Sequence, residues 1–403
     1  MTGIFLKLRK SSLYRYCLWI ALGVSFIILL RLNTILTNPT YIPADDFVRY
    51  WAAGRLMAQG GNPYDPAQVQ VIQDLATGED ASSIVLTPVY PSPWSLPFFA
   101  LFGIIDYPTS RLLFLLANVV FFLLSAELTW KIYHGETKKK FWSWIVCFTL
   151  AATISTLEKG QITAVMLLGI VGFLFFLDKE KGWLAGASLV LVTWKPQLFY
   201  LLWPVLGLWS LQSKNYRPIL GALGFTAVSG ICALAINPNV MNHYLNAILH
   251  LPPFMFATPS IGAYLRYFFF GIEKNWPNFL PMAAGLIWIG VDWIRWRKQW
   301  IWKEKTAVLL FVSLITAAYI WTYDMALFVL PSIQAVIWIL SKKPSGRIWI
   351  AFTGFLIINL LNLLLHRYFD DFWFLWYAPA LFIWFLVVRK LYKPSGLLIE
   401  KAT

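Results

Sequence analysis

The chain has 403 residues, of which 59% are hydrophobic and 13% are charged, and its mean hydropathy is +0.63. A soluble domain carries about twice that share of charged residues, so the composition excludes a soluble protein and indicates that lipid solvates much of the surface. The formal net charge is +14, but the basic residues form short clusters between apolar runs. This distribution argues against nucleic-acid binding and is typical of charges that orient a membrane protein.

Apolar runs close to the length of a bilayer span follow one another along the chain. They predict an all-α polytopic membrane protein with about 12 transmembrane helices, at 16–36, 109–133, 141–157, 160–178, 181–194, 197–211, 217–236, 277–296, 304–320, 324–341, 346–365 and 371–391. The first run follows a basic patch and has no small-residue cleavage site, so we interpret it as an uncleaved span. We find no repeat and no second soluble domain, which predicts a single transmembrane domain over residues 1–403.

The apolar run from Tyr90 to Ile105 has three prolines near its start and is interpreted as an outer interfacial helix rather than a span. With that assignment, most of the 33 lysines and arginines fall on one side and most of the 19 acids on the other. The positive-inside rule then predicts cytoplasmic N- and C-termini in a plasma (inner) membrane. The candidate site lies on the outer face, which has two long loops, 37–108 (with interfacial helices) and 237–276.

The first outer loop contains a predicted helix that begins with two acids, Asp45 and Asp46. Its helical spacing places four residues on one face: Phe47, Tyr50, Trp51 and Gly54. A carboxylate at this position can cap the free amides of the first turn. It can also act as a catalytic base that accepts a proton from a sugar hydroxyl. Adjacent side chains on a helix point about 100° apart, so we expect only one of the two acids to face a site.

Two outer cations have two interpretations each. Lys195, before Pro196 at a predicted helix break, is either a snorkelling interfacial lysine or a cation for a phosphate near the headgroups. Arg266 lies in an amphipathic stretch that begins at Ser260 and suits an interfacial helix, where the same two interpretations hold.

Outer polar residues also occupy three short turns. Glu158 and Gln161 flank Gly160 in a tight turn, and Asp324 follows Tyr323 where a helix cap is expected. The turn from His366 to Asp371 has mixed charge, and we interpret it as a solvated linker.

Spacings typical of metal or phosphate-loop sites are lacking from the sequence. The four histidines show neither H-x-x-x-H nor H-E-x-x-H spacing, and there is no glycine-rich phosphate loop or nucleophile elbow. We therefore expect no cofactor. The paired acids leave a divalent metal open as an alternative, which the small number of outer carboxylates does not favour.

An ordered set of short motifs resembles glycosyltransferase family 87, whose members are membrane enzymes of the GT-C fold. The set begins with Asp46-Phe47-x-x-Tyr50-x-Ala52-Ala53 and Gly60-Gly61-Asn62-Pro63-Tyr64-Asp65, followed by Tyr90-Pro91-Ser92-Pro93. It continues in the family's order with Gly160-Gln161, Lys195-Pro196, Ser260 with Arg266, and Tyr323-Asp324 before Pro331. The resemblance spans nearly the whole chain.

This resemblance implies transfer of a sugar, typically mannose, from a polyprenyl-phosphate donor to a lipid or glycan acceptor, with inversion, on the non-cytoplasmic face. Asp46 is then the general base, whereas Asp45 has no clear counterpart. Lys195 and Arg266 would bind the donor phosphate as it gains charge. The sugar or acceptor pocket would be formed by Glu158, Gln161, Tyr323, Asp324, Tyr50 and Ser260. The implied partners are the donor, the acceptor and membrane lipids, with no nucleic acid.

Two other functional classes fit a chain of this composition. A multi-span transporter or lipid flippase usually carries ionisable residues deep within its spans, but here only Glu127 and Asp292 lie in predicted spans, near the cytoplasmic ends. A structural assembly partner would tolerate substitution of Asp46, Lys195 and Arg266, and it leaves the long outer loops unexplained.

Overall fold

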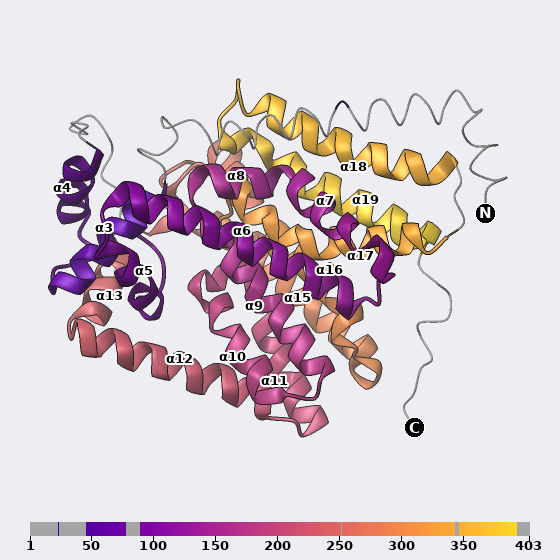
Figure 1. Ribbon diagram of the computed structural model, residues 1–403, viewed down its shortest axis with the longest axis horizontal. Helices are drawn as coiled ribbons and strands as arrows, with labels where there is room; N and C mark the ends of the chain where they lie inside the picture. The colour runs from indigo at the N-terminus through magenta and orange to yellow at the C-terminus, as the bar shows by residue number, and fades with distance from the viewer. Residues whose placement is uncertain (1–22, 24–45, 78–88, 251, 343–345, 393–403) are drawn as a thin grey trace.

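The computed structural model describes residues 23, 46–77, 89–250, 252–342 and 346–392, and these segments fold into helices without a strand (Figure 1). The all-α class predicted from the apolar runs is therefore confirmed for the described residues. The elements in chain order are α3 (Asp46–Gln59), α4 (Pro66–Thr77), η2 (Pro93–Ser95), α5 (Leu96–Gly103), α6 (Tyr107–Ile132), η3 (Thr137–Lys139), α7 (Phe141–Thr149), α8 (Ala151–Lys159), α9 (Thr163–Asp178), α10 (Gly182–Leu189), η4 (Leu191–Trp194), η5 (Pro196–Phe199), α11 (Leu202–Ser213), α12 (Arg217–Ile236), α13 (Val240–His250), η6 (Pro253–Met255), α14 (Ile261–Leu265), η7 (Arg266–Phe270), η8 (Trp276–Asn278), α15 (Phe279–Trp296), η9 (Arg297–Gln299), α16 (Trp302–Ile315), η10 (Thr322–Phe328), α17 (Val329–Leu340), α18 (Gly346–Leu365), η11 (Asp371–Trp376) and α19 (Tyr377–Tyr392).

Five described helical segments are long and apolar enough to cross a membrane, and a sixth is obtained if the bent pair α7–α8 is one span. The five are Tyr107–Ile132, Arg217–Ile236, Thr322–Leu340, Ile348–Leu365 and Asp371–Tyr392. The predicted number of about 12 is therefore not confirmed, and the run at 16–36 lies outside the described residues apart from position 23. The difference has a physical basis, because several apolar helices, such as α9 and α10, are shorter than a bilayer span, and α9 is largely enclosed by other helices.

Helices α3, α4, α5 and α13, which fall in the two loops predicted to be outer, lie together at one end of the molecule (left in Figure 1). Helices α3 and α5 cross in backbone contact, because a Cβ on Gly54 would lie 2.2 Å from the Phe99 carbonyl oxygen and one on Gly103 would lie 2.3 Å from the Arg55 amide nitrogen. Phe47 stacks on Phe114 of α6 with ring centroids 4.3 Å apart. The predicted apolar face of α3 is thus its buried face, and α5 spans only eight residues, as expected for a helix that does not cross the bilayer.

Two breaks interrupt the apolar helices, and side chains from distant segments satisfy the backbone at each. Helices α7 and α8 bend by 61° around Leu150, where Asn359 Oδ1 accepts the Ala151 amide at 2.7 Å. The second break is the one predicted at Lys195-Pro196. There the Ser92 hydroxyl donates to the Thr193 carbonyl at 2.7 Å, so the proline-rich segment supports the unwound end of η4.

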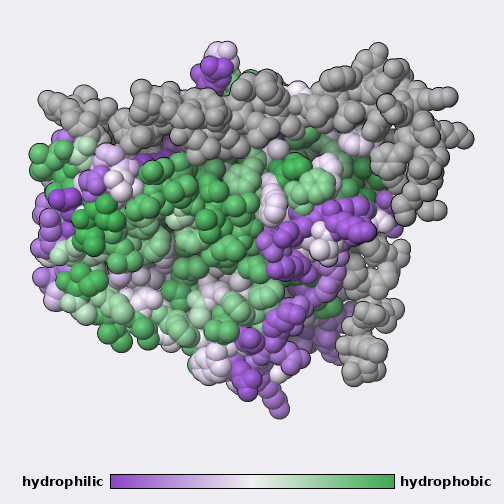
Figure 2. Space-filling model, in the orientation of Figure 1, coloured by the Kyte–Doolittle hydropathy of each residue, from purple (hydrophilic) through white to green (hydrophobic). Residues whose placement is uncertain are grey.

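Charged and polar turns form two separate hydrogen-bonded groups. In the basic group, Lys303 donates to Asp178 Oδ1 at 2.7 Å, and the Lys303 carbonyl accepts from the Tyr133 hydroxyl at 2.8 Å. Lys139 donates to the Leu340 carbonyl at 3.3 Å, and Gln212 donates to the Arg297 carbonyl at 2.7 Å, which adds these turns to the group. The other group contains the start of α3 and the turns at 161, 195, 322 and 371. Figure 2 shows hydrophilic residues gathered on the right and lower right beside a broad hydrophobic surface. This grouping follows the segregation of charge predicted from the sequence.

Candidate active site

The candidate site is built around the side-chain amide of Gln161, in the turn between α8 and α9. Helix α8 ends at Lys159, and Gly160 adopts a left-handed conformation (φ 62°) that closes the turn. The Gln161 amide nitrogen Nε2 donates to Asp46 Oδ2 at 2.7 Å. Its carbonyl oxygen Oε1 accepts from the Tyr50 hydroxyl at 2.9 Å and from Lys195 Nζ at 3.2 Å. One buried amide therefore links a carboxylate, a phenol and an ammonium group.

The orientation of this amide follows from its neighbours. An ammonium group can only donate hydrogen bonds and an ionised carboxylate can only accept them, so Oε1 must face Lys195 and Nε2 must face Asp46. Burial and, next, the negative charge of Asp46 raise the pKa of the Tyr50 hydroxyl well above its usual range, which keeps it a donor. The contacts with Lys195 and Asp46 therefore fix the orientation of Gln161, and the Tyr50 hydroxyl donates to it in that orientation.

Lys195 occupies the helix break between η4 and η5, and its ammonium group has three neighbours. It donates to Asp324 Oδ1 at 2.8 Å and to Gln161, and it lies 4.8 Å from the centroid of the Tyr323 ring. The Asp324 side chain is 1% exposed and that of Lys195 is 12% exposed. A buried carboxylate needs such a partner, because desolvation makes an isolated charge very unfavourable. Lys195 thus neutralises Asp324 and keeps some access to solvent.

Asp324 also organises the start of η10, but from the third helical position of a capping box rather than as the N-cap, which is Trp321. Its Oδ2 accepts the Trp321 backbone amide at 3.0 Å, while Oδ1 accepts from Lys195. The capping role and the ionic role therefore belong to the same carboxylate. The Tyr323 carbonyl accepts from the Thr156 hydroxyl of α8 at 3.0 Å, which ties this segment to the helix that precedes Gln161.

The structure brings together six of the ten residues proposed from the sequence. They are Asp46, Tyr50, Gln161, Lys195, Tyr323 and Asp324. They come from four segments that lie far apart in the sequence: α3, the α8–α9 turn, the η4–η5 break and the start of η10. Asp45 lies outside the described residues.

The other three proposed residues occupy different positions. Glu158 lies in the last turn of α8, where its backbone carbonyl accepts from Arg111 Nη2 at 3.2 Å. Ser260 caps α14, since its Oγ accepts the Ala263 amide at 3.1 Å. Arg266 is buried and donates to the backbone carbonyls of Phe254, Met255 and Ile272. Among the described residues, Ser260 and Arg266 have no hydrogen bond to the Gln161 cluster, and both stabilise the segment 252–276.

Two residues that the sequence did not assign to the site support it. Asp371 Oδ2 accepts the Thr322 backbone amide at 3.0 Å, and Asp371 Oδ1 lies 3.0 Å from His366 Nε2. The prediction of a solvated linker holds for residues 367–370, which are exposed, but not for Asp371, which stabilises the segment that carries Asp324. A mixed-charge turn after a span has the same composition whether it is solvated or packed, so its sequence held no signal for this contact.

Arg111 of α6 is the second missed residue. It is 4% exposed, and its Nη2 donates to the Leu157 carbonyl at 2.9 Å and to that of Glu158. A cation at the C-terminal end of a helix complements the helix dipole and satisfies its free carbonyls. Arg111 therefore positions the turn that carries Gln161. In the described part of the chain, no group of three or more His, Cys, Asp or Glu residues is placed to hold a metal ion.

Comparison with known proteins assigns the chain to a family. The model of glycosyltransferase family 87 matches residues 89–322, more than half of the chain. The chain belongs to glycosyltransferase family 87. The resemblance predicted from the ordered motifs is thereby confirmed. The matched region contains Gln161 and Lys195, whereas Asp46 and Asp324 lie outside it.

A curated relative comes from Mycolicibacterium smegmatis and is an alpha-(1->3)-arabinofuranosyltransferase. The two proteins are 27% identical over 288 residues, which cover 67% of this chain and 64% of the relative. The match thus covers slightly less than two thirds of the relative's length. No solved structure matches the chain, so the GT-C fold implied by the resemblance is not confirmed.

Proposed function

We propose that this family 87 protein is an integral-membrane glycosyltransferase that moves a sugar from a polyprenyl-phosphate donor to a hydroxyl of a lipid or glycan acceptor, with inversion at the anomeric carbon. The observation that supports this most is the Gln161 amide, which donates to Asp46 and accepts from Lys195. A carboxylate able to take a proton and a cation able to face a phosphate are thus one amide group apart.

The proposed step is a single displacement. Asp46 takes the proton of the acceptor hydroxyl as its oxygen attacks the anomeric carbon, and the bond from that carbon to the phosphate oxygen breaks with its electron pair leaving on the phosphate. Attack opposite the leaving group inverts the configuration. The Asp46 carboxylate has acceptor capacity beyond its bond to Gln161, and its side chain is partly exposed.

Lys195 serves as the cation for the leaving polyprenyl phosphate in this proposal. The phosphate gains charge as the glycosidic bond breaks, and a nearby ammonium group stabilises that charge more in the transition state than in the ground state. Asp324 neutralises Lys195 between turnovers. A direct phosphate contact by Arg266 would require release of its backbone carbonyls, so we assign Arg266 the role of holding the second outer loop.

An aromatic row beside the cluster suits binding of the sugar or acceptor. Ring centroids are 6.2 Å apart for Tyr90 and Phe256, 6.5 Å for Phe256 and Trp321, and 6.1 Å for Trp321 and Tyr323. At one end of the row, the Tyr323 ring lies against the Lys195 ammonium group. At the other end, Tyr90 of the first outer loop contacts Phe256 of the second. The row forms one wall of the proposed pocket. The motifs favour mannose as the sugar, and the relative's name adds arabinofuranose as a second donor to test.

We place this cluster on the non-cytoplasmic face, with both termini in the cytoplasm. Support comes from the basic turns, which join one another in a group separate from the Gln161 cluster. Basic turns mark the cytoplasmic side of a membrane protein.

The test is a transfer assay with the full-length protein in nanodiscs. Short-chain polyprenyl-phosphate mannose and polyprenyl-phosphate arabinofuranose would each be offered with a panel of lipid and glycan acceptors, and NMR would assign the product anomer. We expect an inverted product from the wild type and a loss of about 10²- to 10⁴-fold for Asp46→Asn. Asp74→Asn is the matched control, because Asp74 lies on α4 outside the family motifs and the Gln161 cluster, where it accepts from the Gln70 side chain. Full activity of Asp46→Asn would refute the base assignment, and a folded wild type without product from either donor would refute the proposed donor class.

A further inference from the structure

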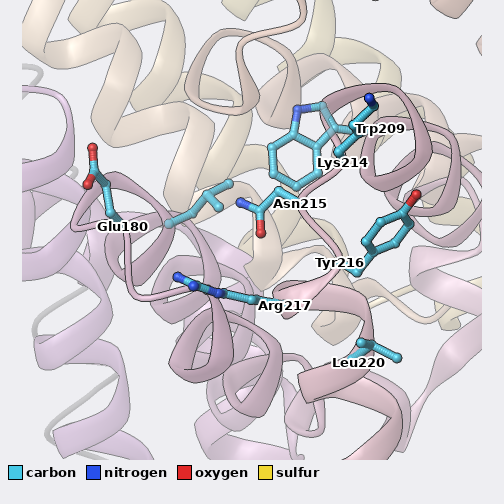
Figure 3. Close-up of a pocket in the computed structure, with 9 residues that line it drawn as sticks. Glu180, Trp209, Lys214, Asn215, Tyr216, Arg217 and Leu220 are labelled. Atoms are coloured by element: carbon cyan, nitrogen blue, oxygen red, sulfur yellow. The ribbon is translucent and has the colours of Figure 1, made fainter.

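A surface cavity of about 740 Å³ lies in the basic group of turns, between the α9–α10 turn and the α11–α12 turn (Figure 3). Its polar lining includes Glu180, Asn215 and Arg217, and its apolar lining includes Trp209 and Leu220. It lies away from the Gln161 cluster, and the catalytic proposal does not use it.

The two walls of the cavity are held at a fixed separation. Helices α10 and α12 cross in close contact, because a Cβ on Gly186 would lie 2.3 Å from the Pro218 carbonyl oxygen and one on Gly221 would lie 2.9 Å from the Trp183 carbonyl oxygen. Glu180 precedes α10 and Arg217 begins α12, so this crossing sets the backbone positions of the two residues relative to each other, and both side chains are exposed.

The charged side chains of the cavity have no partner that would occupy them. Figure 3 shows the Arg217 guanidinium in the space between Glu180 and Asn215. Within the described part of the chain, neither Glu180 nor Arg217 forms an ion pair. Two cations (Lys214 and Arg217), a neutral amide and a carboxylate thus line one open space, which suits a ligand that carries both charges.

An apolar track leads away from this space along α12. Leu220 lines the cavity, and the track continues on the exposed face of the helix with Leu223, Phe225, Val228, Ile231, Leu234 and Ile236. Only 17% of the most apolar stretch of α12 is buried inside the protein. A molecule with its polar end in the cavity could therefore lay a hydrocarbon chain against this helix.

We propose that the cavity binds the headgroup of a phospholipid that carries a primary amine, of the phosphatidylethanolamine type. The phosphate would accept hydrogen bonds from the guanidinium of Arg217, whose planar fork matches phosphate oxygens, and from the Asn215 amide. The ammonium would donate to the Glu180 carboxylate, and one acyl chain would follow α12. This site is independent of the proposed sugar transfer.

The experiment is native mass spectrometry of the full-length protein in detergent, titrated with phosphatidylethanolamine, phosphatidylglycerol and phosphatidylcholine of the same acyl chains. We expect phosphatidylethanolamine to be retained most strongly. Arg217→Gln should weaken all three lipids by about tenfold, since it removes charge-assisted hydrogen bonds to the phosphate. Glu180→Gln should abolish the preference for the amine headgroup and leave phosphatidylglycerol binding intact. Arg295→Gln is the matched control, because Arg295 is exposed and lies outside the cavity lining.

Two further results decide between the site and its alternatives. Inorganic phosphate and phosphoethanolamine, which lack the acyl chain, should displace the lipid only weakly; equal binding of a free phosphate would overturn the lipid assignment. Equal retention of the three lipids by wild type and both cavity variants would show nonspecific surface lipid and would also overturn it. Thermal unfolding of each variant without added lipid confirms that the comparison is made between folded proteins.

Discussion

Replacement of Gln161 by leucine tests whether the buried amide unites the base and the cation into one catalytic group. Leucine fills a similar volume but removes both polar atoms. Asp46 then loses its donor at 2.7 Å, while Tyr50 and Lys195 lose their shared acceptor. The salt bridge between Lys195 and Asp324 remains, so the buried carboxylate stays compensated.

The magnitude follows from the hydrogen bond to Asp46. A bond to a charged group contributes about 1.5–3 kcal/mol, and 1.4 kcal/mol corresponds to a factor of ten. If this bond orients Asp46 toward the acceptor hydroxyl, its loss should lower kcat/KM by about ten- to hundredfold. Most of the loss should appear in kcat, because Gln161 acts through the base rather than on substrate binding.

The assay is a double-mutant cycle of Gln161→Leu and Asp46→Asn, with initial rates of transfer measured in nanodiscs. Residues that act as a unit give non-additive effects. In the Asp46→Asn background, Gln161→Leu should therefore cost much less than it does in the wild type. Gln334→Leu provides a control at a buried glutamine of α17, whose replacement should leave kcat near the wild-type value.

Additive effects in this cycle would refute the reasoning. If Gln161→Leu lowered kcat by the same factor with or without the Asp46 carboxylate, the amide would act on the reaction independently of the base. Thermal unfolding must accompany each rate, because a variant with a much lower melting temperature would report folding rather than orientation.

Three further predictions concern stability and positioning. Gly54→Ala should lower stability by about 1–3 kcal/mol in thermal or denaturant unfolding, because its Cβ would meet backbone at the α3–α5 crossing. Gly224→Ala, with nothing within 4 Å of the new Cβ, should instead be neutral or stabilise α12 by up to about 1 kcal/mol. Lys195→Met should lower the free energy of unfolding by about 3–5 kcal/mol, because it leaves the Asp324 carboxylate buried and uncompensated. The double variant Lys195→Met with Asp324→Leu should recover this stability but remain inactive. A double variant as unstable as Lys195→Met would contradict the prediction. Asp371→Ala should lower kcat several-fold with little change in donor KM, because it removes the acceptor of the Thr322 backbone amide. An unchanged kcat would show that the hydrogen bond from Thr322 to Asp371 is not needed for activity.

Local patterns predicted the local features of this fold. The proline after Lys195 predicted the helix break, and three prolines near Tyr90 predicted a short helix. Glycine between Glu158 and Gln161 predicted a tight turn, which its left-handed backbone confirms. These features depend on backbone sterics and on residues close in sequence.

The sequence alone did not predict which distant segments contact one another. Gln161 meets a carboxylate 115 residues earlier, and Lys195 meets one 129 residues later. The motifs selected these residues as candidates, but no local pattern states which acid pairs with which cation. The span count differed for a related reason, since a short apolar helix enclosed by protein has the same composition as one that faces lipid.

The broken helices explain why polar chemistry can be assembled in so apolar a chain. Backbone groups at membrane depth must be hydrogen-bonded within the protein, so a helix can unwind only where other segments supply partners. Ser92 supplies one for the break before Lys195, and Asn359 supplies one for the bend that begins α8. Each break redirects a helix end toward the same cluster, one carrying Lys195 and the other leading to Gln161. The irregular backbone before Lys195 therefore lies beside the proposed site, and the bend at Leu150 lies one short helix away from it.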